Sequence, residues 1–396
     1  MSVQITVRAY NVRFGDCSLV SIKDGAIERH ALIDFGNSPT AVKRDAGKND
    51  VFEPVARDIR TRTGGVLDLL VMTHEHLDHL EGFHHQRAIF NSMTVRQVWM
   101  SLMSRPGYYD EFTKAKPQKE ALRALATFVA RWRQANRFRL VPETLQAVVA
   151  NNNLFELSNA ERVEYLRALT PSPKYFSRDR QQGVASHGLG GTVKVDVLAP
   201  EADASVYYGK LAGKAFGLGE RLRHAANTMG SRTRRTRALK RPPHMAADEF
   251  DRLKDEIAEL DVSSVFAIDK AANNTSLVLR ITVGNKSLIF AGDAEEESWA
   301  QMAQRKLLKP VDFLKIAHHG SVNGMPFEGQ HSVVDSLLRT NRRTTALIST
   351  CRGVYGESKE TEIPSHRLLE LLTSRCRRVV VTEDVAAPGG FVDIKV

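Results

Sequence analysis

The feature that most constrains this chain is a group of metal-ligand side chains directly after a short apolar segment. Leu67–Met72 is apolar and ends abruptly at Thr73, which predicts a buried strand. Imidazole and carboxylate groups follow it within six residues, at His74, His76, Asp78 and His79. Borderline cations such as zinc prefer these two ligand types. A solvated polar loop is the alternative, but four such residues at one strand end favour a metal site.

The spacing within this segment predicts ligands for two ions rather than one. His74 and His76 are two residues apart, so their side chains project to one side of an extended chain. Asp78 and His79 come where the chain turns, which lets them face a second ion. Glu75 lies between the two histidines and is expected to point away from the site.

Two later segments offer further ligands, each directly after a predicted strand. Asp293 follows the strand predicted over Lys286–Ala291, where a carboxylate can bridge two ions, although Gly-Asp alone is a common turn sequence. His318 and His319 follow the strand predicted over Phe313–Ala317. Loops at one edge of an open α/β sheet converge and form sites. Three strand ends that each carry metal ligands therefore predict a single metal centre.

The rest of the chain indicates an α/β core interrupted by two basic, helical stretches. Alternating or short apolar runs predict strands, and Lys23-Asp24-Gly25 and Gly284-Asn285 predict hairpin turns. The predicted strands are Val3–Ala9, Ser18–Ile22, His30–Ile33, Leu67–Met72, Thr192–Leu198, Leu277–Val283, Lys286–Ala291, Phe313–Ala317, Thr345–Ser349 and Arg378–Thr382. The predicted helices are Lys119–Arg133, Leu154–Leu169, Asp248–Leu260, Ala294–Leu308 and Pro364–Cys376, the last with a proline at its first position.

Composition limits the class of protein. The chain has 396 residues, of which 42% are hydrophobic and 26% charged, which excludes a wholly disordered chain and a fibre. Apolar runs are too short to span a membrane, and the first residues lack the apolar run of a signal peptide. Three widely spaced cysteines exclude a disulfide framework and a cysteine-based zinc site, so the cytoplasm is the expected compartment.

Positive charge is concentrated in two segments. The net charge is +10, with +6 in residues 102–140 and +8 in residues 221–241, which leaves −4 for the remainder. Local basicity of this kind suggests a polyanionic partner such as nucleic acid, and a solvated helix face or flexible loop is the alternative. Arg131-Trp132-Arg133 and Arg137-Phe138-Arg139 suit phosphate contacts with base stacking, although both aromatic residues also fit the core face of a helix.

The order of the ligand residues resembles the metallo-β-lactamase hydrolase superfamily. That family carries the HxHxDH string seen here at residues 74–79, followed by a later aspartate and a late histidine. Further segments are similar to the soluble metallo-β-lactamase domain of the competence DNA-uptake protein ComEC: Tyr10–Asp16, Leu32–Gly36, Asn273–Arg280, Ile289–Asp293 and Leu314–Ser321. The resemblance covers about residues 1–100, 192–201 and 263–396.

The resemblance implies a four-layer αββα sandwich with a two-metal site at one edge. The core would then comprise residues 1–101, the strand region 192–202 and residues 263–396. Residues 102–191 would form a helical insertion, and residues 203–262 a second, basic helical insertion.

The resemblance also implies a role for each ligand. His74 and His76 would hold the first ion. Asp78 and His79 would hold the second ion, together with either His318 or His319. Asp293 would bridge the two ions. The family's further histidine before the bridging aspartate is replaced by Asn273-Asn274, so the first ion would be loosely held or absent. Asp78 and His366 are candidate catalytic residues, and His366 follows a late strand. The alternative for His366 is a solvated residue in the first turn of a helix.

These observations predict an enzyme that hydrolyses its substrate with metal-activated water. Two divalent ions are expected, with zinc favoured by the ligands and manganese or iron also compatible. The favoured substrate is a phosphodiester in nucleic acid. One alternative is a small ester, lactone or cyclic nucleotide. Another is an effector subunit of a bacterial defence or DNA-processing complex, with the insertions as protein-binding surfaces.

Overall fold

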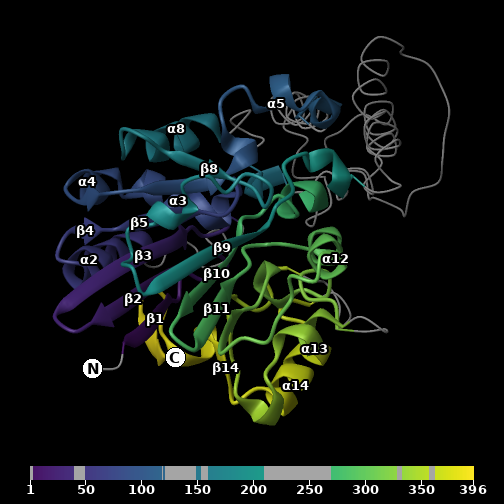
Figure 1. Ribbon diagram of the computed structural model, residues 1–396. Coiled ribbons are helices and arrows are strands. Elements are labelled where there is room, and N and C mark those ends of the chain that lie inside the picture. The colour runs from purple at the N-terminus through teal and green to yellow at the C-terminus, as the bar shows by residue number, and fades with distance from the viewer. Residues whose placement is uncertain are drawn as a thin grey trace, which may run out of the picture.

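The computed structural model describes residues 3–39, 50–117, 119–120, 149–152, 159–208, 269–327, 332–355 and 362–396 (Figure 1). Within these residues the chain forms two large β-sheets that face each other, and helices pack on their outer faces. The mixed α/β class predicted from the sequence is confirmed.

The first large sheet contains seven strands in the order β15-β1-β2-β3-β5-β7-β8. Neighbours are antiparallel from β15 to β3 and parallel from β3 to β8. The strands are β1 (Gln4–Tyr10), β2 (Cys17–Asp24), β3 (Ile27–Phe35), β5 (Leu69–Met72), β7 (Val98–Ser101), β8 (Lys174–Phe176) and β15 (Phe391–Lys395). Because β3 and β5 are parallel neighbours, the end of β3 and the residues after β5 lie side by side.

The second large sheet contains six strands in the order β14-β13-β12-β11-β10-β9. The pairs from β9 to β11 are antiparallel, and the pairs from β11 to β14 are parallel. The strands are β9 (Val193–Ala199), β10 (Val278–Val283), β11 (Lys286–Phe290), β12 (Phe313–Lys315), β13 (Thr345–Ile348) and β14 (Arg378–Val381). A separate short pair is formed by β4 (Val66–Leu67) and β6 (Thr94–Val95).

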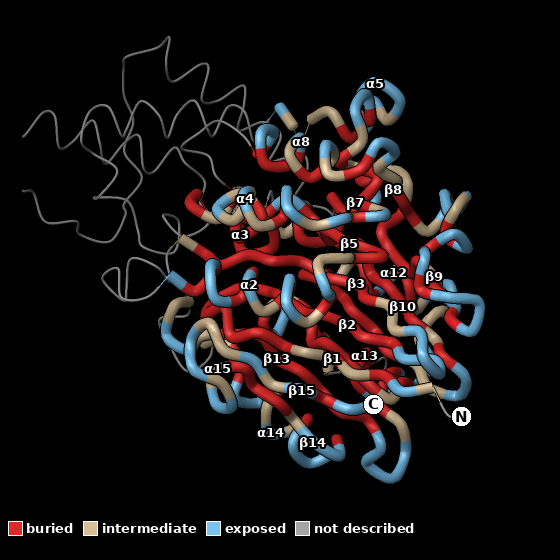
Figure 2. Tube along the Cα trace, turned by 90° about the vertical axis from the view of Figure 1, so that its left-hand side faces the viewer, coloured by how far each residue is buried: buried red, intermediate tan, exposed pale blue. Residues whose placement is uncertain are grey.

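Three apolar clusters define the layers of the structure. One joins Val7 and Val71 of the first sheet to Leu279 and Phe313 of the second, so it lies between the sheets. The other two fill the space between each sheet and its helices. Figure 2 shows that the strands are buried along most of their length, while the exposed trace is mainly in turns and helix faces. The metal-ligand segments therefore emerge from a well-packed scaffold.

The helices divide between the two outer faces according to the cluster they join. On the first sheet lie α2 (Phe52–Arg62), α3 (Leu77–His85), α4 (Arg87–Asn91) and α8 (Ala160–Ala168). On the second lie α12 (Glu296–Gln304), α13 (Val333–Leu337) and α14 (His366–Arg375). Shorter helices are α5 (Tyr108–Glu111) and α15 (Thr382–Val385), with 3₁₀ turns η1 (Leu102–Ser104), η2 (Thr113–Ala115), η5 (Val184–Ser186), η6 (Ala204–Tyr207), η7 (His318–Gly320) and η8 (Thr340–Arg342).

Most predicted elements of the core are confirmed, with some differences at their ends. The apolar segment before His74 is divided between β4 and β5, because residues 66–67 pair with β6 instead of the main sheet. The last predicted helix does not begin at Pro364. It begins at His366, since the Ser365 side chain caps it by accepting a hydrogen bond from Leu368 N.

The two predicted insertions are described only in part. Residues 102–191 contribute α5 and α8, but also β8, which extends the first sheet. The predicted helix Asp248–Leu260, both Arg-aromatic segments and residues 221–241 lie outside the described residues. The domain boundaries therefore stay predictions. None of the described helices combines the length and apolar character that crossing a membrane requires.

Candidate metal centre

Strand ends from both sheets bring four of the predicted ligands together, namely His74, Asp78, His79 and Asp293, whereas His76 lies outside this cluster, with Nε2 3.0 Å from Asn152 Oδ1. His74 follows β5 of the first sheet, and α3 begins at Leu77, so Asp78 and His79 lie in its first turn. Asp293 follows β11, and His319 follows β12 of the second sheet. The site thus lies where the two sheets meet, at one end of their parallel strands.

Four buried residues form the centre of this site. The ligand atoms of His74, Asp78, His79 and Asp293 all lie within 4.8 Å of one another. Each of these residues has one buried polar atom without a hydrogen-bond partner within the described chain. These atoms are His74 Nε2, Asp78 Oδ1, His79 Nε2 and Asp293 Oδ1. Buried polar atoms are normally paired, so a converging unpaired set of imidazole nitrogens and carboxylate oxygens fits a divalent cation.

His319 contacts two members of this group, Asp78 and Asp293, whereas His318 contacts a different carboxylate. His319 Nε2 is 3.0 Å from Asp78 Oδ2 and 3.3 Å from Asp293 Oδ2. Two ligand atoms of one tetrahedral zinc ion lie roughly 3.3–3.4 Å apart, because each is about 2.0–2.1 Å from the ion. His318 instead places Nδ1 3.1 Å from Glu295 Oε1. The structure thus places His319, and not His318, beside Asp78, and the role of His319 as a ligand stays a prediction.

The backbone of the His318–Gly320 turn is held in an unusual conformation. His318 and His319 have φ values of 47° and 54°, in the left-handed region that residues other than glycine rarely adopt. Ser365 N donates to Gly320 O over 2.8 Å, and Gly320 N donates to Ala317 O over 3.1 Å, which holds the turn against neighbouring segments. Such conformations cluster at functional sites, where the surrounding structure enforces them.

A second layer of groups orients the ligand imidazoles. Asp34 Oδ2 accepts a hydrogen bond of 2.8 Å from His79 Nδ1, and the Ser349 carbonyl accepts one of 2.9 Å from His319 Nδ1. Both rings therefore keep their Nε2 lone pairs for the centre, as metal-binding histidines generally do. Asp16 forms a buried ion pair with Lys315 nearby. No local pattern in the sequence marks Asp34, Asp16 or Lys315, although all three lie in the segments that carry the family resemblance.

Two glycines let the N-terminal segments approach the ligand helix. A Cβ atom at Gly36 would clash with the backbone of Asp78 and His79, and one at Gly15 would lie 2.7 Å from Asp78 O. The approach is needed because Asp16 N donates to Asp78 O over 2.9 Å. These contacts fix the first turn of α3 and with it two of the ligands.

The charges of the centre are strongly coupled. Burial by itself would lower the pKa of His79, but Asp293 and Asp34 outweigh it and hold that pKa well above its usual value. The pKa of His319 is raised to about 10 against the effect of burial, chiefly by Asp293. Burial would raise the pKa of Asp293, but His79 and His319 hold it well below the usual range. Burial lowers the pKa of His74 well below normal, which keeps this ring neutral.

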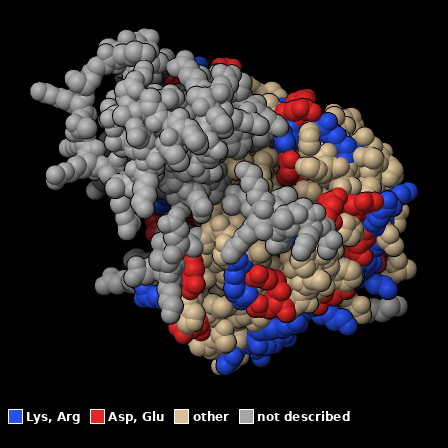
Figure 3. Space-filling view, turned by 180° about the vertical axis from the view of Figure 1, so that it is seen from behind, with Lys and Arg blue, Asp and Glu red and all other residues tan. Residues whose placement is uncertain are grey.

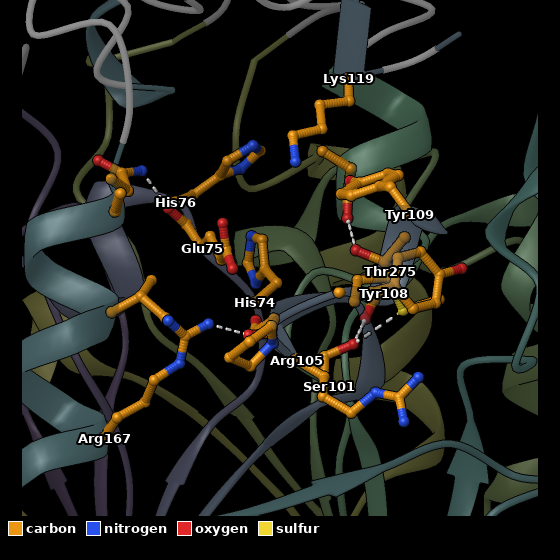
Figure 4. Close-up of a pocket in the computed structure, with 18 of the residues that line it drawn as sticks. His74, Glu75, His76, Ser101, Arg105, Tyr108, Tyr109, Lys119, Arg167 and Thr275 are labelled. Atoms are coloured by element: carbon orange, nitrogen blue, oxygen red, sulfur yellow. Dashed lines mark hydrogen bonds between the residues drawn. The ribbon is translucent and has the colours of Figure 1, made fainter. Parts of the chain in front are cut away.

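A pocket opens beside the first two histidines (Figure 4). Its volume is about 410 Å³, and it is lined by residues that include His74, His76 and Glu75, the loop around Tyr108, and α8. Glu75 is an exposed residue on the wall of this pocket, and it is not among the residues whose ligand atoms converge at the centre.

Cationic side chains surround the same pocket. Arg105, Lys119 and Arg167 line it, and the Lys119 ammonium group lies 4.6 Å from the ring centroid of Tyr109. Arg167 also pairs with Glu164 over 2.7 Å and donates to the Ser104 carbonyl. The pocket thus offers positive charge and an aromatic surface next to the metal ligands.

His366, the other predicted catalytic residue, lies apart from this group. Its side chain is 66% exposed at the start of α14, and Nδ1 is 3.5 Å from Glu370 Oε1. The His318–Gly320 turn is close by, since Ser365 is bonded to it. The structure does not bring the His366 ring into contact with the described ligands, so its catalytic role stays a prediction.

The fold and the site together define a mixed α/β protein with a buried histidine–aspartate cluster that could hold a metal ion. No family model matches the chain. Over 126 residues it is 30% identical to ComE operon protein 3 of Bacillus subtilis (strain 168), a match that covers 32% of this chain and 15% of that protein. The chain thus spans a small part of this relative's length. This match agrees with the family resemblance of the motifs.

One solved structure also matches the chain. The metallo-β-lactamase fold protein YhfI from Bacillus subtilis matches over 99% of this chain and 100% of its own, at 10% sequence identity and a TM-score of 0.34. The motifs that carry the family resemblance are at residues 74–79, 293 and 318–319.

Proposed function

We propose that this protein is a metal-dependent hydrolase of the metallo-β-lactamase type that cleaves phosphodiester bonds in nucleic acid. The convergence of buried, unpaired ligand atoms from both sheets carries this proposal. The layered arrangement of helices around two facing sheets supports the αββα sandwich that this class of enzyme uses. Fold alone does not choose a substrate, so the substrate is argued from the pocket and the charge.

The proposed ligands are the residues that occupy the positions of the family motif. His74 and His76 would hold one ion, Asp78, His79 and His319 the other, and Asp293 would lie between them. Divalent ions bound there would supply hydroxide at neutral pH and stabilise developing negative charge. Zinc is the proposed metal, and the same donors accept manganese or iron.

The chain's own groups would prepare this chemistry. Asp34 and the Ser349 carbonyl hold the Nδ1 atoms of His79 and His319, so the rings cannot rotate freely. Asp78 Oδ2 is 3.0 Å from His319 Nε2, while Asp78 Oδ1 has no hydrogen-bond partner in the described chain. That second oxygen is the atom proposed to orient the attacking nucleophile.

The surroundings of the pocket support an anionic substrate. Arg105, Lys119 and Arg167 can bind a phosphate group, and Tyr109 offers a surface for a base. On the face shown in Figure 3, Lys and Arg side chains are interspersed with Asp and Glu. Affinity for a long polyanion is therefore assigned to the basic segments 102–140 and 221–241.

Cleavage assays on metal-depleted protein test the proposal. We expect cleavage of DNA or RNA after addition of Zn²⁺ or Mn²⁺, and a loss of about 10²–10³-fold or more in His76→Ala and Asp293→Ala. Equal cleavage by both variants would show that a contaminant acts and would refute the proposal. Neutralising Arg232, Arg234, Arg235 and Arg237 together should weaken salt-sensitive binding, and unchanged affinity would remove the charge argument.

A second candidate function is hydrolysis of a small ester, lactone or cyclic nucleotide. A pocket of about 410 Å³ falls within the range of small-molecule sites, which favours this alternative. The two candidates differ in competition experiments. A cyclic nucleotide or small ester that is hydrolysed faster than an oligonucleotide at the same concentration would favour the second. Cytoplasmic location and a role of the insertions in binding other proteins also stay proposals.

A further inference from the structure

A second charged pocket lies at the edge of the second sheet opposite the metal centre. Its volume is about 260 Å³. Because β11 to β14 are parallel neighbours, the residues that begin these strands share one edge of the sheet. Asp293 and His319 follow the other ends of β11 and β12. The pocket is lined by Asn285, Lys286, Asp312, Arg339, Arg343 and Arg377.

Four cations in this lining surround a single carboxylate. Asp312 Oδ2 accepts a hydrogen bond from Arg339 Nη2 over 3.0 Å, and Asp312 Oδ1 is 3.6 Å from Lys286 Nζ. One acid is therefore shared between two cations. Within the part of the chain that the structure describes, neither Arg343 nor Arg377 forms an ion pair with a carboxylate. The lining thus keeps a net positive charge.

Hydrogen bonds hold the two cationic loops of the pocket together. Arg342 donates from Nε to the Cys376 carbonyl over 3.0 Å and from Nη2 to the Thr373 carbonyl over 2.9 Å. The loop before β13 is thereby fastened to the loop before β14. Asn341 and Arg342 have φ values of 59° and 53°, in the left-handed region that residues other than glycine rarely adopt. The fold therefore holds these cations close together against their mutual repulsion.

The charge at this edge differs from that of the surrounding chain. Outside residues 102–140 and 221–241, the chain carries a net charge of −4. The loops at the edge hold ten Lys and Arg residues against one Asp, in residues 284–287, 305–312, 339–343 and 375–378. Two of these cations are paired with acids outside the loops, Arg305 with Glu201 and Arg375 with Asp335. The others form a local positive surface in an otherwise acidic remainder.

We propose that this pocket binds a backbone phosphate of nucleic acid, in addition to the contacts at the metal centre. Guanidinium groups donate paired hydrogen bonds that match the geometry of phosphate oxygens. The volume of about 260 Å³ is below the roughly 300–1,000 Å³ of sites that enclose a whole small molecule. The pocket therefore suits one phosphate of a longer chain. The identity of that chain as nucleic acid rests on the proposed function.

The separation of the pocket from the metal centre allows one nucleic acid molecule to contact both. His319 is seven residues after Asp312. The two backbone positions are therefore at most roughly 24 Å apart, since a strand rises about 3.4 Å per residue. Phosphates along one strand of a DNA duplex are about 3.4 Å apart on the helix axis, so about seven base pairs cover this distance.

Salt-dependent binding tests the proposal apart from cleavage. Fluorescence anisotropy measures binding of the full-length protein to a labelled, cleavage-resistant phosphorothioate DNA duplex of about 20 base pairs. Loss of one phosphate contact lowers the slope of log K against log salt concentration by about 0.9. We expect this decrease in Arg343→Gln/Arg377→Gln, with binding about eightfold weaker at 0.1 M salt. Arg343→Lys/Arg377→Lys keeps both charges and should keep the parental slope.

Arg57→Gln/Arg60→Gln is the matched control, because it removes the same charge from exposed positions of α2 on the first sheet. It should keep the parental affinity and slope. A parental slope in Arg343→Gln/Arg377→Gln, or an equal loss in the control, would overturn the inference. Inorganic phosphate is the second probe. If the variant lost phosphate binding but bound DNA like the parent, the pocket would belong to free phosphate and the nucleic-acid assignment would be wrong. Pocket-dependent DNA binding without any cleavage would contradict the proposed hydrolase and support this site.

Discussion

Asp34 lies directly behind the metal centre, and replacing it by asparagine removes a negative charge while keeping the shape of the side chain. Its carboxylate accepts hydrogen bonds from His79 Nδ1 over 2.8 Å, from Thr73 N over 2.8 Å and from Thr73 Oγ1 over 2.7 Å. Asp34 has a φ of 57°, a left-handed conformation that asparagine also tolerates. Asp34→Asn therefore changes the charge behind His79 with little change of backbone.

The expected effect is a weaker metal site. The Asp34 carboxylate fixes the proton of His79 on Nδ1 and makes Nε2 a better donor. Loss of such an outer partner typically costs 10–100-fold in metal affinity, which is about 1.4–2.7 kcal/mol. The asparagine oxygen can still accept one hydrogen bond, so we expect a value near the middle of this range. Competition between metal-depleted protein and a chromogenic chelator measures the dissociation constant.

Asp68→Asn provides the control. Asp68 is also buried and precedes β5, at the end of that strand opposite the metal centre. It accepts hydrogen bonds from His30 N over 2.9 Å and from Arg96 over 2.8 Å, so its replacement disturbs a comparable buried carboxylate. The control should bind metal like the parent. Asp34→Asn with a dissociation constant within twofold of the parent would refute the reasoning.

Three further outcomes follow from particular contacts. Lys315→Met should cost about 3–5 kcal/mol and lower the urea midpoint, because it leaves a buried carboxylate without its ammonium partner. For Glu81, burial would raise the pKa of the carboxyl group, but hydrogen bonds from His85 and Arg162 outweigh burial and hold that pKa below normal. The stability that these hydrogen bonds add is therefore present above about pH 4.3, the pKa of an unfolded glutamate, and it is lost as the pH falls through the pKa of Glu81 in the folded protein. The urea midpoints of Glu81→Gln and of the parent should therefore converge in acid. His366→Ala should lower kcat less than about tenfold, because the ring is 66% exposed, whereas a general acid or base would cost about 10²–10⁴-fold.

The ligand segments were predictable because each follows a short apolar strand. The positions of His74, Asp78, His79 and Asp293 depend on strand ends, which apolar patterns locate to within a few residues. The choice between His318 and His319 was not predictable. Both side chains extend from the same turn after β12. Which of them contacts Asp78 depends on how β12 of the second sheet lies relative to α3 on the first sheet, and no local sequence pattern contains this information.

The supporting residues depend on contacts between distant parts of the chain. Asp34 resembles any aspartate at a strand end, and its role requires that β3 and β5 be parallel neighbours.

The location of the ligands at the junction of the two sheets connects metal binding to folding. His79 extends from the seven-stranded sheet and Asp293 from the six-stranded sheet, and their ligand atoms are 3.2 Å apart. An ion at 100 times its dissociation constant adds about 2.7 kcal/mol to the folded state, or about 3 °C in Tm for a chain of this length. Because one ion would join both sheets, His79→Ala and Asp293→Ala should each abolish this shift in thermal unfolding. A variant that keeps the full shift would mean that the ion is held by one sheet alone.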